Sequence, residues 1–363
     1  MDTQINRRRL MELGTAATMG GWMKSSRTSA ARGEEIPSDG TVAAAGRGGY
    51  VHTGHTMGDA WYFVDDSAGQ VHMYYLTQPL DERGPRFVGH AVSDDLRDWE
   101  TLPPAIEQGP PGAWDDEKVC SGSVFERDGR YWMAYSATSS AESPPSEPWR
   151  WQRIGVAWSD DLTHWTKLGE NPVMEAGPPH YERMGSGQRK MHHWRDPFLF
   201  EHGGHAYAFI TARATEGRIK QRGVVALARS SDMHRWEILP PIEHDRIAEE
   251  MEVPQIYQIN ERWYLVFLTL GRFMAPGFAE RFEGAVPERS NFAMVGDSPF
   301  GPFRIHGTGQ IISHGLDEYF YAAQLVHLRQ KWWLLATIHD DRSQRICRPI
   351  EVYVDATGIH PVA

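Results

Sequence analysis

Five short apolar segments recur along the chain and constrain its fold more than any other feature. Each follows a polar or turn residue, runs through aromatic and β-branched side chains, and ends at or near a small or hydroxyl-bearing residue. This composition is typical of buried β-strands. The five segments are residues 70–77, 130–137, 205–212, 262–269 and 331–338.

A turn motif follows the apolar segment in three of these units. It reads Ser-Asp-Asp-Leu-Arg-Asp-Trp at residues 93–99, recurs at 159–165 and 230–236, and has a degenerate form at 296–303. Ser and Asp side chains bind nearby backbone amides in turns. We therefore expect the Asp residues of the motif to be structural, and its Trp to pack between neighbouring units.

Repeats of this length, each with several short strands, predict the blades of a β-propeller. Five units fill the chain from about residue 50 to Ala363, and strong helical periodicity is absent. We predict an all-β fold, a five-bladed β-propeller over residues 50–363. Residues 32–49 are rich in Gly, Ala and Ser and are interpreted as a flexible leader.

The first 31 residues resemble a targeting segment. Three arginines at 7–9 precede an uncharged apolar run over 13–23 and a cluster of small residues at 29–31. This pattern is typical of a twin-arginine export signal cleaved near Ala31, and a basic, disordered N-terminus is the alternative. We expect export to the periplasm or the cell exterior. No other apolar run is long enough to cross a membrane, so the mature protein is expected to have no membrane partner.

Charge and composition limit the classes of partner. The formal net charge of -11 argues against nucleic acid and anionic membranes. Fourteen Trp residues are typical of chains that bind sugars or repeat an aromatic element. Two Cys residues, Cys120 and Cys347, are too few for a disulfide framework or a zinc site. We interpret both as buried thiols, and whether they pair stays open.

Acidic residues recur where the innermost strands of three units begin. In each unit, a strand upstream of the aromatic one is expected to line the centre, and Asp59, Asp196 and Glu252 take matching places in units one, three and four. Inner strands of a propeller converge at one end, so we expect the three carboxylates to meet there. The predicted inner strands are residues 58–63, 120–125, 195–200, 252–257 and 321–326.

Four short segments around these acids carry a family resemblance. Trp-Arg-Asp-Pro at 194–197 and Glu-Val-Pro at 252–254 resemble the Arg-Asp-Pro and Glu-Cys-Pro motifs of glycoside hydrolase families 32 and 68. Residues 89–99 and Ser-Gly-Ser at 121–123 also resemble segments of family 32. The chain is thus similar to the five-bladed propeller glycoside hydrolases, families 32, 43 and 68, and most closely to family 32.

Two features depart from the family 32 pattern. Residues 55–61 read His-Thr-Met-Gly-Asp-Ala-Trp, where that family usually has Trp-Met-Asn-Asp-Pro-Asn-Gly. The C-terminal β-sandwich typical of family 32 has no counterpart before the sequence ends, and a bare propeller is more like family 43. The sugar specificity is therefore left open.

The resemblance implies a role for each acid. Asp59 would be the nucleophile or base, Glu252 the general acid, and Asp196 the carboxylate that binds sugar hydroxyls and stabilises the transition state. The first hypothesis is a retaining, β-fructofuranosidase-like hydrolase. The alternatives are a family 43-like inverting arabinofuranosidase or xylosidase, and a glycan-binding propeller without activity, since a fold does not by itself imply chemistry. A sialidase-like hydrolase ranks below these.

An oligosaccharide or polysaccharide is the expected substrate, with no cofactor and no catalytic metal. His192 and His193 are adjacent and would point apart on a strand. Glu249 and Glu250 compete with Glu252 for the role of acid, and Glu252 is preferred because Val-Pro follows it. For Trp61 and Tyr257, packing between blades is an equal alternative to substrate contact. The residues expected to contact substrate are His55, Trp61, Trp114, Asp115, Ser121, His193, Arg195 and Tyr257.

Overall fold

Twenty β-strands make up almost all of the regular structure in the described part of the chain. The computed structural model describes residues 48–81, 86–141, 151–183, 193–312, 320–339 and 344–362, all within one compact unit. No helix in these ranges is long and apolar enough to cross a membrane. The short helical segments are η1 (Ile219–Gln221), η2 (Gly271–Phe273) and α2 (Pro276–Ala279).

The strands form five antiparallel sheets, each built from consecutive stretches of chain. The first two sheets are β1 (Ala60–Asp65), β2 (Gln70–Thr77), β3 (Phe87–Ser93) and β4 (Glu100–Ile106), then β5 (Lys118–Arg127), β6 (Arg130–Thr138), β7 (Gln152–Ser159) and β8 (Thr166–Lys167). The next two are β9 (Trp194–His202), β10 (His205–Arg213), β11 (Gly223–Ser230) and β12 (Glu237–Leu239), then β13 (Glu252–Ile259), β14 (Arg262–Leu270) and β15 (Arg289–Gly296). The fifth is β16 (Phe320–Leu328), β17 (Lys331–His339), β18 (Gln344–Ile346), β19 (Ile350–Asp355) and β20 (Gly358–Pro361).

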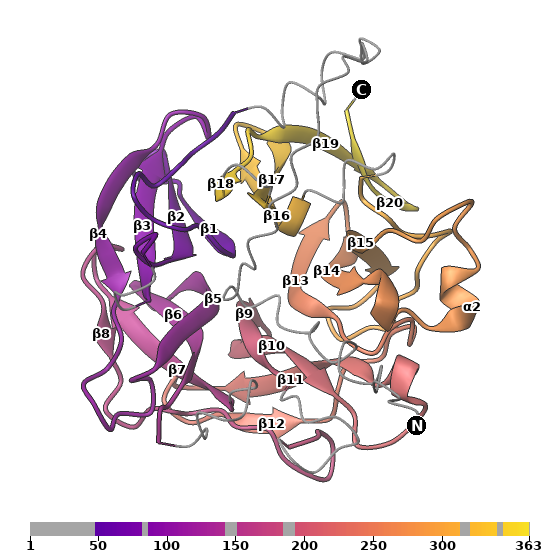
Figure 1. Cartoon of the computed structure of the whole chain (residues 1–363), viewed down its shortest axis with the longest axis horizontal. Coiled ribbons are helices and arrows are strands. Elements are labelled where there is room, and N and C mark those ends of the chain that lie inside the picture. The colour runs from indigo at the N-terminus through magenta and orange to yellow at the C-terminus, as the bar shows by residue number, and fades with distance from the viewer. Residues whose placement is uncertain are drawn as a thin grey trace, which may run out of the picture. The chain divides into compact units, whose positions relative to one another are not determined.

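The first strand of every sheet lies at a common centre. Figure 1 shows β1, β5, β9, β13 and β16 around this centre, and each contacts the next, with β16 returning to β1. The second strands β2, β6, β10, β14 and β17 coincide with the five predicted apolar segments to within one residue at their ends. The prediction of an all-β, five-bladed β-propeller is confirmed.

The hydrophobic core is divided into layers between neighbouring blades. Successive residues of a strand point to opposite faces. The second strand of a blade therefore contributes side chains to both of the apolar layers that flank its sheet. Ile210 of β10 packs in one layer with Val156 of blade two, whereas the adjacent Phe209 packs in the next layer with Phe267 of blade four. This arrangement fixes how the blades are rotated about the centre, and therefore where their inner strands begin.

The Ser-Asp turn motif makes hydrogen bonds that explain its recurrence. In blade one, Ser93 Oγ accepts a hydrogen bond from the backbone N–H of Leu96 at 2.9 Å. Asp95 Oδ1 accepts hydrogen bonds from the backbone N–H groups of Arg97 and Asp98 at 2.7 and 2.9 Å. Leu96 has a left-handed backbone with φ of 65°, and Trp99 Nε1 donates to its carbonyl oxygen at 3.2 Å. Asp161 and Asp232 make the corresponding contacts in blades two and three. These Asp residues hold turns, as predicted.

The Trp residues of the motif pack between blades, which confirms a second prediction. Trp99 lies between blades five and one, with its ring 6.3 Å from that of Tyr62 and in the same apolar layer as Val326 of β16. Trp165 of blade two lies 5.8 Å from the ring of Tyr74 on β2. Each turn thus anchors its blade to the preceding one.

Residues before β1 close the ring against the last blade. The backbone of Tyr50 pairs antiparallel with Ile346 of β18, with both N–H to carbonyl distances at 3.0 Å. Thr337 Oγ1 on β17 donates to the carbonyl oxygen of Gly58 at 2.7 Å. Blade five therefore contains chain from both ends of the propeller.

Two further predictions concern the start of the chain and the cysteines. The predicted export signal over residues 1–31 and nearly all of the predicted leader over 32–49 lie outside the described residues. Cys120 and Cys347 are both free and buried, as interpreted from the sequence. Burial raises the pKa of the Cys120 thiol to about 11.

Candidate active site

Four of the five inner strands carry a β-bulge at the same end. In β5, β9, β13 and β16, two residues of the inner strand lie opposite a single residue of the second strand of the blade. Asp196, Val253 and Ala322 lie in three of these bulges and have left-handed φ of 56°, 49° and 51°. A bulge bends its strand and turns side chains in new directions. Adjacent residues can therefore both face the centre of the ring, which a regular strand forbids.

The strand register places Glu252 level with Arg195 rather than with Asp196. Arg195 pairs with Thr211 and Glu252 pairs with Leu268, each directly before its bulge, whereas Asp196 is itself a bulge residue. The prediction of one shared offset is therefore wrong by one residue between blades three and four. The bulge and the longer Glu side chain still bring the Glu252 carboxyl group to the guanidinium that binds Asp196.

The guanidinium of Arg195 joins three buried carboxyl groups. Its Nε lies 3.4 Å from Asp196 Oδ2, and its Nη2 lies 3.2 Å from Glu252 Oε1 and also contacts Glu250 Oε1. Asp196, Glu250 and Glu252 are only 5%, 1% and 4% exposed. A buried charge without a partner is strongly unfavourable. Arg195 is shared by all three carboxyl groups, and Glu250 has a second basic partner in His193, so support for the charged form differs among them.

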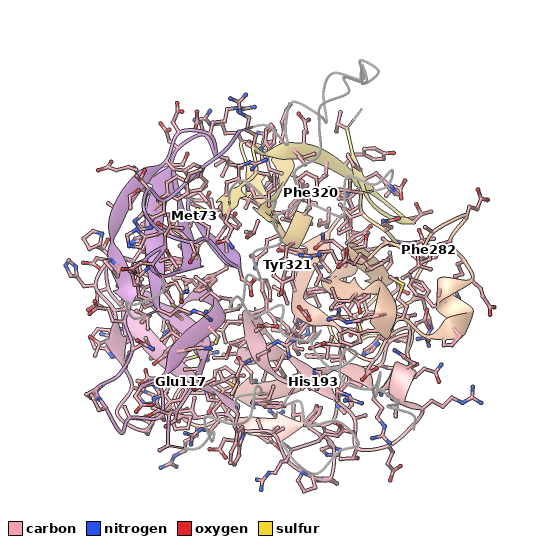
Figure 2. The ribbon with its side chains drawn as sticks, viewed as in Figure 1. Met73, Glu117, His193, Phe282, Phe320 and Tyr321 are labelled. Carbon is pink, nitrogen blue, oxygen red and sulfur yellow. The ribbon has the colours of Figure 1, made fainter. Side chains whose placement is uncertain are left out.

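Neutral donors fix two of these carboxyl groups. Asp196 Oδ2 accepts hydrogen bonds from Thr211 Oγ1 at 2.9 Å and from the backbone N–H of Val253 at 3.2 Å. Tyr321, which lies close to the centre of the ring in Figure 2, donates its hydroxyl to Glu252 Oε2 at 2.8 Å. Blades three, four and five therefore all contribute to the cluster.

Asp59 reaches the same end of the ring from blade one. Ser121 Oγ of β5 donates to Asp59 Oδ2. Gly122 follows Ser121 and lets β5 approach β6, because a Cβ at that position would lie 2.3 Å from the carbonyl oxygen of Ala134. The predicted Ser-Gly-Ser segment therefore binds a catalytic candidate through its first Ser and depends on the Gly for close strand packing.

Burial and neighbouring charges shift the pKa values of Glu252 and Glu250 in opposite directions. Burial raises the pKa of Glu252 to about 8, the negative charge of Glu250 adds to this effect, and Arg195 opposes it. Burial also acts to raise the pKa of Glu250, but Arg195 and His193 outweigh it and hold that pKa well below its usual value. At neutral pH, Glu252 is therefore protonated and Glu250 is ionised.

The pKa of Asp59 lies between these extremes. Burial and the charge of Asp196 raise the pKa of Asp59 to about 6, while the Ser121 hydrogen bond and the charges of Arg195 and Arg86 limit the rise. Burial also raises the pKa of Asp196, against the opposing charge of Arg195. A pair of carboxyl groups with separated pKa values, Asp59 and Glu252, suits one for nucleophilic attack and the other for proton donation.

Six of the predicted site residues meet in this cluster, and five make their contacts elsewhere. Trp61 is 1% exposed and stacks 6.3 Å from the ring of Tyr74 on β2. Tyr257 packs against the rings of Phe198 and Trp332, both at 5.9 Å. These contacts favour the packing alternative for both residues. The six that meet are Asp59, Ser121, His193, Arg195, Asp196 and Glu252.

The other three residues lie in local clusters. Asp115 is buried and forms an ion pair with Lys167 Nζ at 2.6 Å. Trp114 packs beside Tyr135 of the same blade, with ring centroids 5.5 Å apart. His55 stacks on His52 at 4.1 Å. These neighbours account for the three side chains without a sugar, and their predicted contact with substrate stays a prediction.

Sequence reasoning missed three residues of the cluster. The sequence marks Glu250 only as a competitor of Glu252, because nothing in a run of Glu residues tells which way each one faces. Arg86 is buried, and its charge acts on Asp59. Tyr321 occupies in blade five the position that Glu252 occupies in blade four, directly before the bulge. Comparison of the repeats would have found Tyr321 alone.

Within the described ranges, no group of three or more His, Cys, Asp and Glu side chains is arranged to hold a metal ion. Arg195 and Arg86 bring positive charge to the carboxyl groups of the cluster. The expectations of no cofactor and no catalytic metal stay predictions.

Comparison with known proteins relates the chain to one family. The model of the glycosyl hydrolases family 32 N-terminal domain matches residues 57–344. The sucrose-6-phosphate hydrolase of Zymomonas mobilis is 26% identical over 266 residues, which cover 70% of this chain and 47% of that protein. The chain spans about half the length of the curated relatives that it matches first.

Solved structures share the fold. A GH32 β-fructofuranosidase from Bombyx mori superimposes with a TM-score of 0.61 at 19% identity, over 84% of this chain and 62% of that one. An inulosucrase from Halalkalicoccus jeotgali, bound to kestose, gives a TM-score of 0.67 at 19% identity, over 85% and 87% of the two chains. At this identity the likeness concerns the propeller alone.

Proposed function

Because the chain belongs to glycoside hydrolase family 32, we propose that it is an enzyme that cleaves fructofuranoside bonds in a saccharide. The observation that carries the proposal is the pair of Asp59 and Glu252, two carboxyl groups at one end of the ring with pKa values of about 6 and about 8. Only one of them is ionised at neutral pH. Glycoside cleavage needs this combination of anion and acid.

In the first step, Asp59 attacks the anomeric carbon of the fructosyl unit while Glu252 donates its proton to the leaving oxygen. The bond from the anomeric carbon to the leaving oxygen breaks, and a bond to the Asp59 carboxylate forms. Ser121 supports this role, because its hydrogen bond favours the anion of Asp59. The leaving group departs as a neutral alcohol.

In the second step, water attacks the same carbon and displaces Asp59. Glu252, now ionised, takes the proton of that water and returns to its starting state. Two displacements at one carbon give retention of configuration. Arg195 and Tyr321 support this step, because both lie within hydrogen-bonding distance of Glu252 and stabilise its transient anion.

Asp196 is proposed to bind sugar hydroxyls beside the reacting carbon. Its carboxyl group is held by Thr211, Val253 and Arg195, so its orientation is fixed before substrate arrives. A preorganised anion of this kind stabilises positive charge that develops on the sugar ring in the transition state. His193 and Arg195 are the proposed donors to hydroxyl groups of the substrate.

The relatives include a sucrose-6-phosphate hydrolase and an exo-inulinase, so the phosphorylated sugar and inulin belong among the substrates of a test. The purified protein would be incubated with sucrose, sucrose 6-phosphate, inulin, levan, arabinan and aryl arabinofuranosides. We expect free fructose, and a loss of at least about 10³-fold in kcat for Asp59→Asn and Glu252→Gln. The matched control is Asp94→Asn, an exposed acid in the first turn motif.

Each outcome separates the alternatives. Release of arabinose instead of fructose would support the family 43-like reading. No release from any substrate, with saccharide binding intact, would support a glycan-binding propeller. Reaction in methanol tests stereochemistry, because retention gives the methyl β-fructofuranoside from a β-fructofuranoside, and inversion gives the α-anomer.

A further inference from the structure

Glu250 is the best-paired carboxylate of the cluster, although it has no place in the two displacement steps. Its Oε1 contacts Arg195 Nη2 and lies 2.9 Å from His193 Nδ1. It is 1% exposed, and its backbone carbonyl oxygen accepts a hydrogen bond from Thr269 Oγ1 at 2.7 Å. The side chain is therefore fixed from its backbone to its tip.

Glu250 and Glu252 compete for one nitrogen atom. Arg195 Nη2 contacts Glu250 Oε1 closely, whereas Glu252 Oε1 lies 3.2 Å away from the same Nη2. His193 adds a second partner to Glu250 and none to Glu252. Arg195 donates a charge-assisted hydrogen bond to Glu250 and forms only an ion pair with Glu252, so Glu250 is its better-bound partner.

A second guanidinium, that of Arg289, lies 5.9 Å from the centre of the Tyr321 ring, but among the described residues no ion pair joins it to Glu252. Asp196 of β9 and Glu250 are acidic, and Tyr321 of β16 donates a neutral hydroxyl. Asp59 of blade one brings one more negative charge close to Tyr321. Among the buried carboxyl groups that share Arg195, Glu252 therefore has the weakest support for an anion.

We propose that Glu250 is a positioning residue that competes with Glu252 for the Arg195 guanidinium and thereby keeps the proton of the general acid in place. This inference rests on the proposed role of Glu252 in glycoside cleavage. Glu250 itself neither attacks the sugar nor donates a proton to it. Its charge raises the cost of ionising Glu252, and its hydrogen bond with Arg195 limits how far that guanidinium lowers the cost.

The first test follows the Glu252 carboxyl group directly and needs no substrate. Its titration would be recorded by ¹³C NMR of protein labelled at Glu Cδ, with the signal assigned by its loss in Glu252→Gln. We expect Glu250→Gln to lower the Glu252 titration midpoint by about 1 to 3 pH units. Glu250→Asp withdraws the carboxylate from Arg195 but keeps its charge, so we expect a smaller downward shift.

Glu249→Gln is the matched control. Glu249 is the sequence neighbour of Glu250 and equally buried, but it faces Arg213 and Lys220 at 3.7 and 3.5 Å. We expect no shift of the Glu252 midpoint in this variant. An unchanged midpoint in both Glu250 variants, or an equal shift in Glu249→Gln, would overturn the proposal. If Glu250→Gln does not fold, the shift in Glu250→Asp decides.

The second test uses the dependence of kcat/KM on pH. In Glu250→Gln the alkaline limb should move to lower pH by the same amount as the Glu252 midpoint. The ratio of variant to wild-type kcat/KM should then recover toward one as pH falls below the Glu252 midpoint of the variant, whereas a purely structural defect lowers it equally at every pH. A protein that cleaves no fructoside would disprove the proposed function, and the NMR titration would still decide the role of Glu250.

Discussion

Arg195 and Glu252 stand at equivalent positions of adjacent inner strands, and the guanidinium of one lies 3.2 Å from the carboxyl group of the other. Tyr321 holds the same position in the next blade and donates to the same Glu252. Three successive blades thus use one backbone position, directly before a bulge, to build the surroundings of a single acid.

The pH dependence of kcat/KM is expected to be bell-shaped, with limbs near pH 6 and near pH 8. Asp59 acts as an anion, so activity rises as pH passes its pKa of about 6. Glu252 acts as an acid, so activity falls as pH passes its pKa of about 8. Initial rates at low substrate concentration, from about pH 4 to about pH 10, check this prediction. A curve without an alkaline limb would contradict it.

Replacing Glu252 with Gln is expected to stabilise the protein at alkaline pH. The pKa of Glu252 is raised to about 8 in the fold. From its unfolded value up to that pH, the unfolded chain gives up a proton that the folded chain keeps, so the free energy of unfolding of the wild type falls as pH rises. The variant lacks this loss. Its advantage in Tm should grow from about pH 5 to about pH 8 and then level off, and a constant difference would contradict the prediction.

The two Ser residues of the Ser-Gly-Ser segment are expected to have different roles, Ser121 in catalysis and Ser123 in packing between blades. Ser121 donates to Asp59, so Ser121→Ala should raise the pKa of Asp59 and move the acid limb of kcat/KM to higher pH. Ser123 Oγ accepts the backbone N–H of Leu199 at 2.8 Å, between blades two and three. Ser123→Ala should lower Tm and leave the acid limb in place. Equal pH profiles for the two variants would refute this assignment.

The turn motif is expected to contribute to stability and not to catalysis. Asp95→Ala removes the acceptor of two backbone N–H groups, so it should lower the free energy of unfolding by about 1 to 2 kcal/mol. Asp94→Ala, in the adjacent exposed position, should change it by less than about 0.5 kcal/mol. Urea unfolding of both variants measures the difference. A change in kcat for Asp95→Ala without a loss of stability would argue for a functional role.

Trp61 is expected to act through packing. It is 1% exposed against Tyr74, and its Nε1 has no hydrogen-bond partner among the described residues, so Trp61→Phe removes volume without breaking a hydrogen bond. We expect a loss of about 1 to 3 kcal/mol in stability and an unchanged KM. A raised KM with an unchanged Tm would restore the predicted contact with substrate.

The repeat pattern predicted the propeller because each second strand is buried on both faces and reads as one apolar, aromatic run. Residues 70–77 became β2 with the same bounds, and the other four segments ended within one residue of their strands. The inner strands were located because they precede these runs. Bulges leave no such mark in the sequence, so the one-residue difference between Asp196 and Glu252 was not predicted.

The site was predicted in its acids and less well in its surroundings. Asp59, Asp196 and Glu252 stood out because charged residues rarely begin a buried strand. Trp61 and Tyr257 alternate along strands whose two faces both pack, and the sequence cannot tell which face meets a neighbouring blade. Glu249 and Glu250 turn opposite ways, toward Arg213 and Arg195, and this difference depends on partners far away in the chain.

The pairing of Tyr50 with Ile346 also orders events during synthesis. A ribosome releases the first blade long before β18 exists, so Tyr50 must wait without its partner until almost all of the propeller has emerged. Contacts between residues so distant in sequence form late. A nascent chain interrupted before β18 would hold four blades and the first two strands of the fifth, and Tyr50 would still lack its partner strand. The ring can therefore close only after the strand that pairs with Tyr50 has been made.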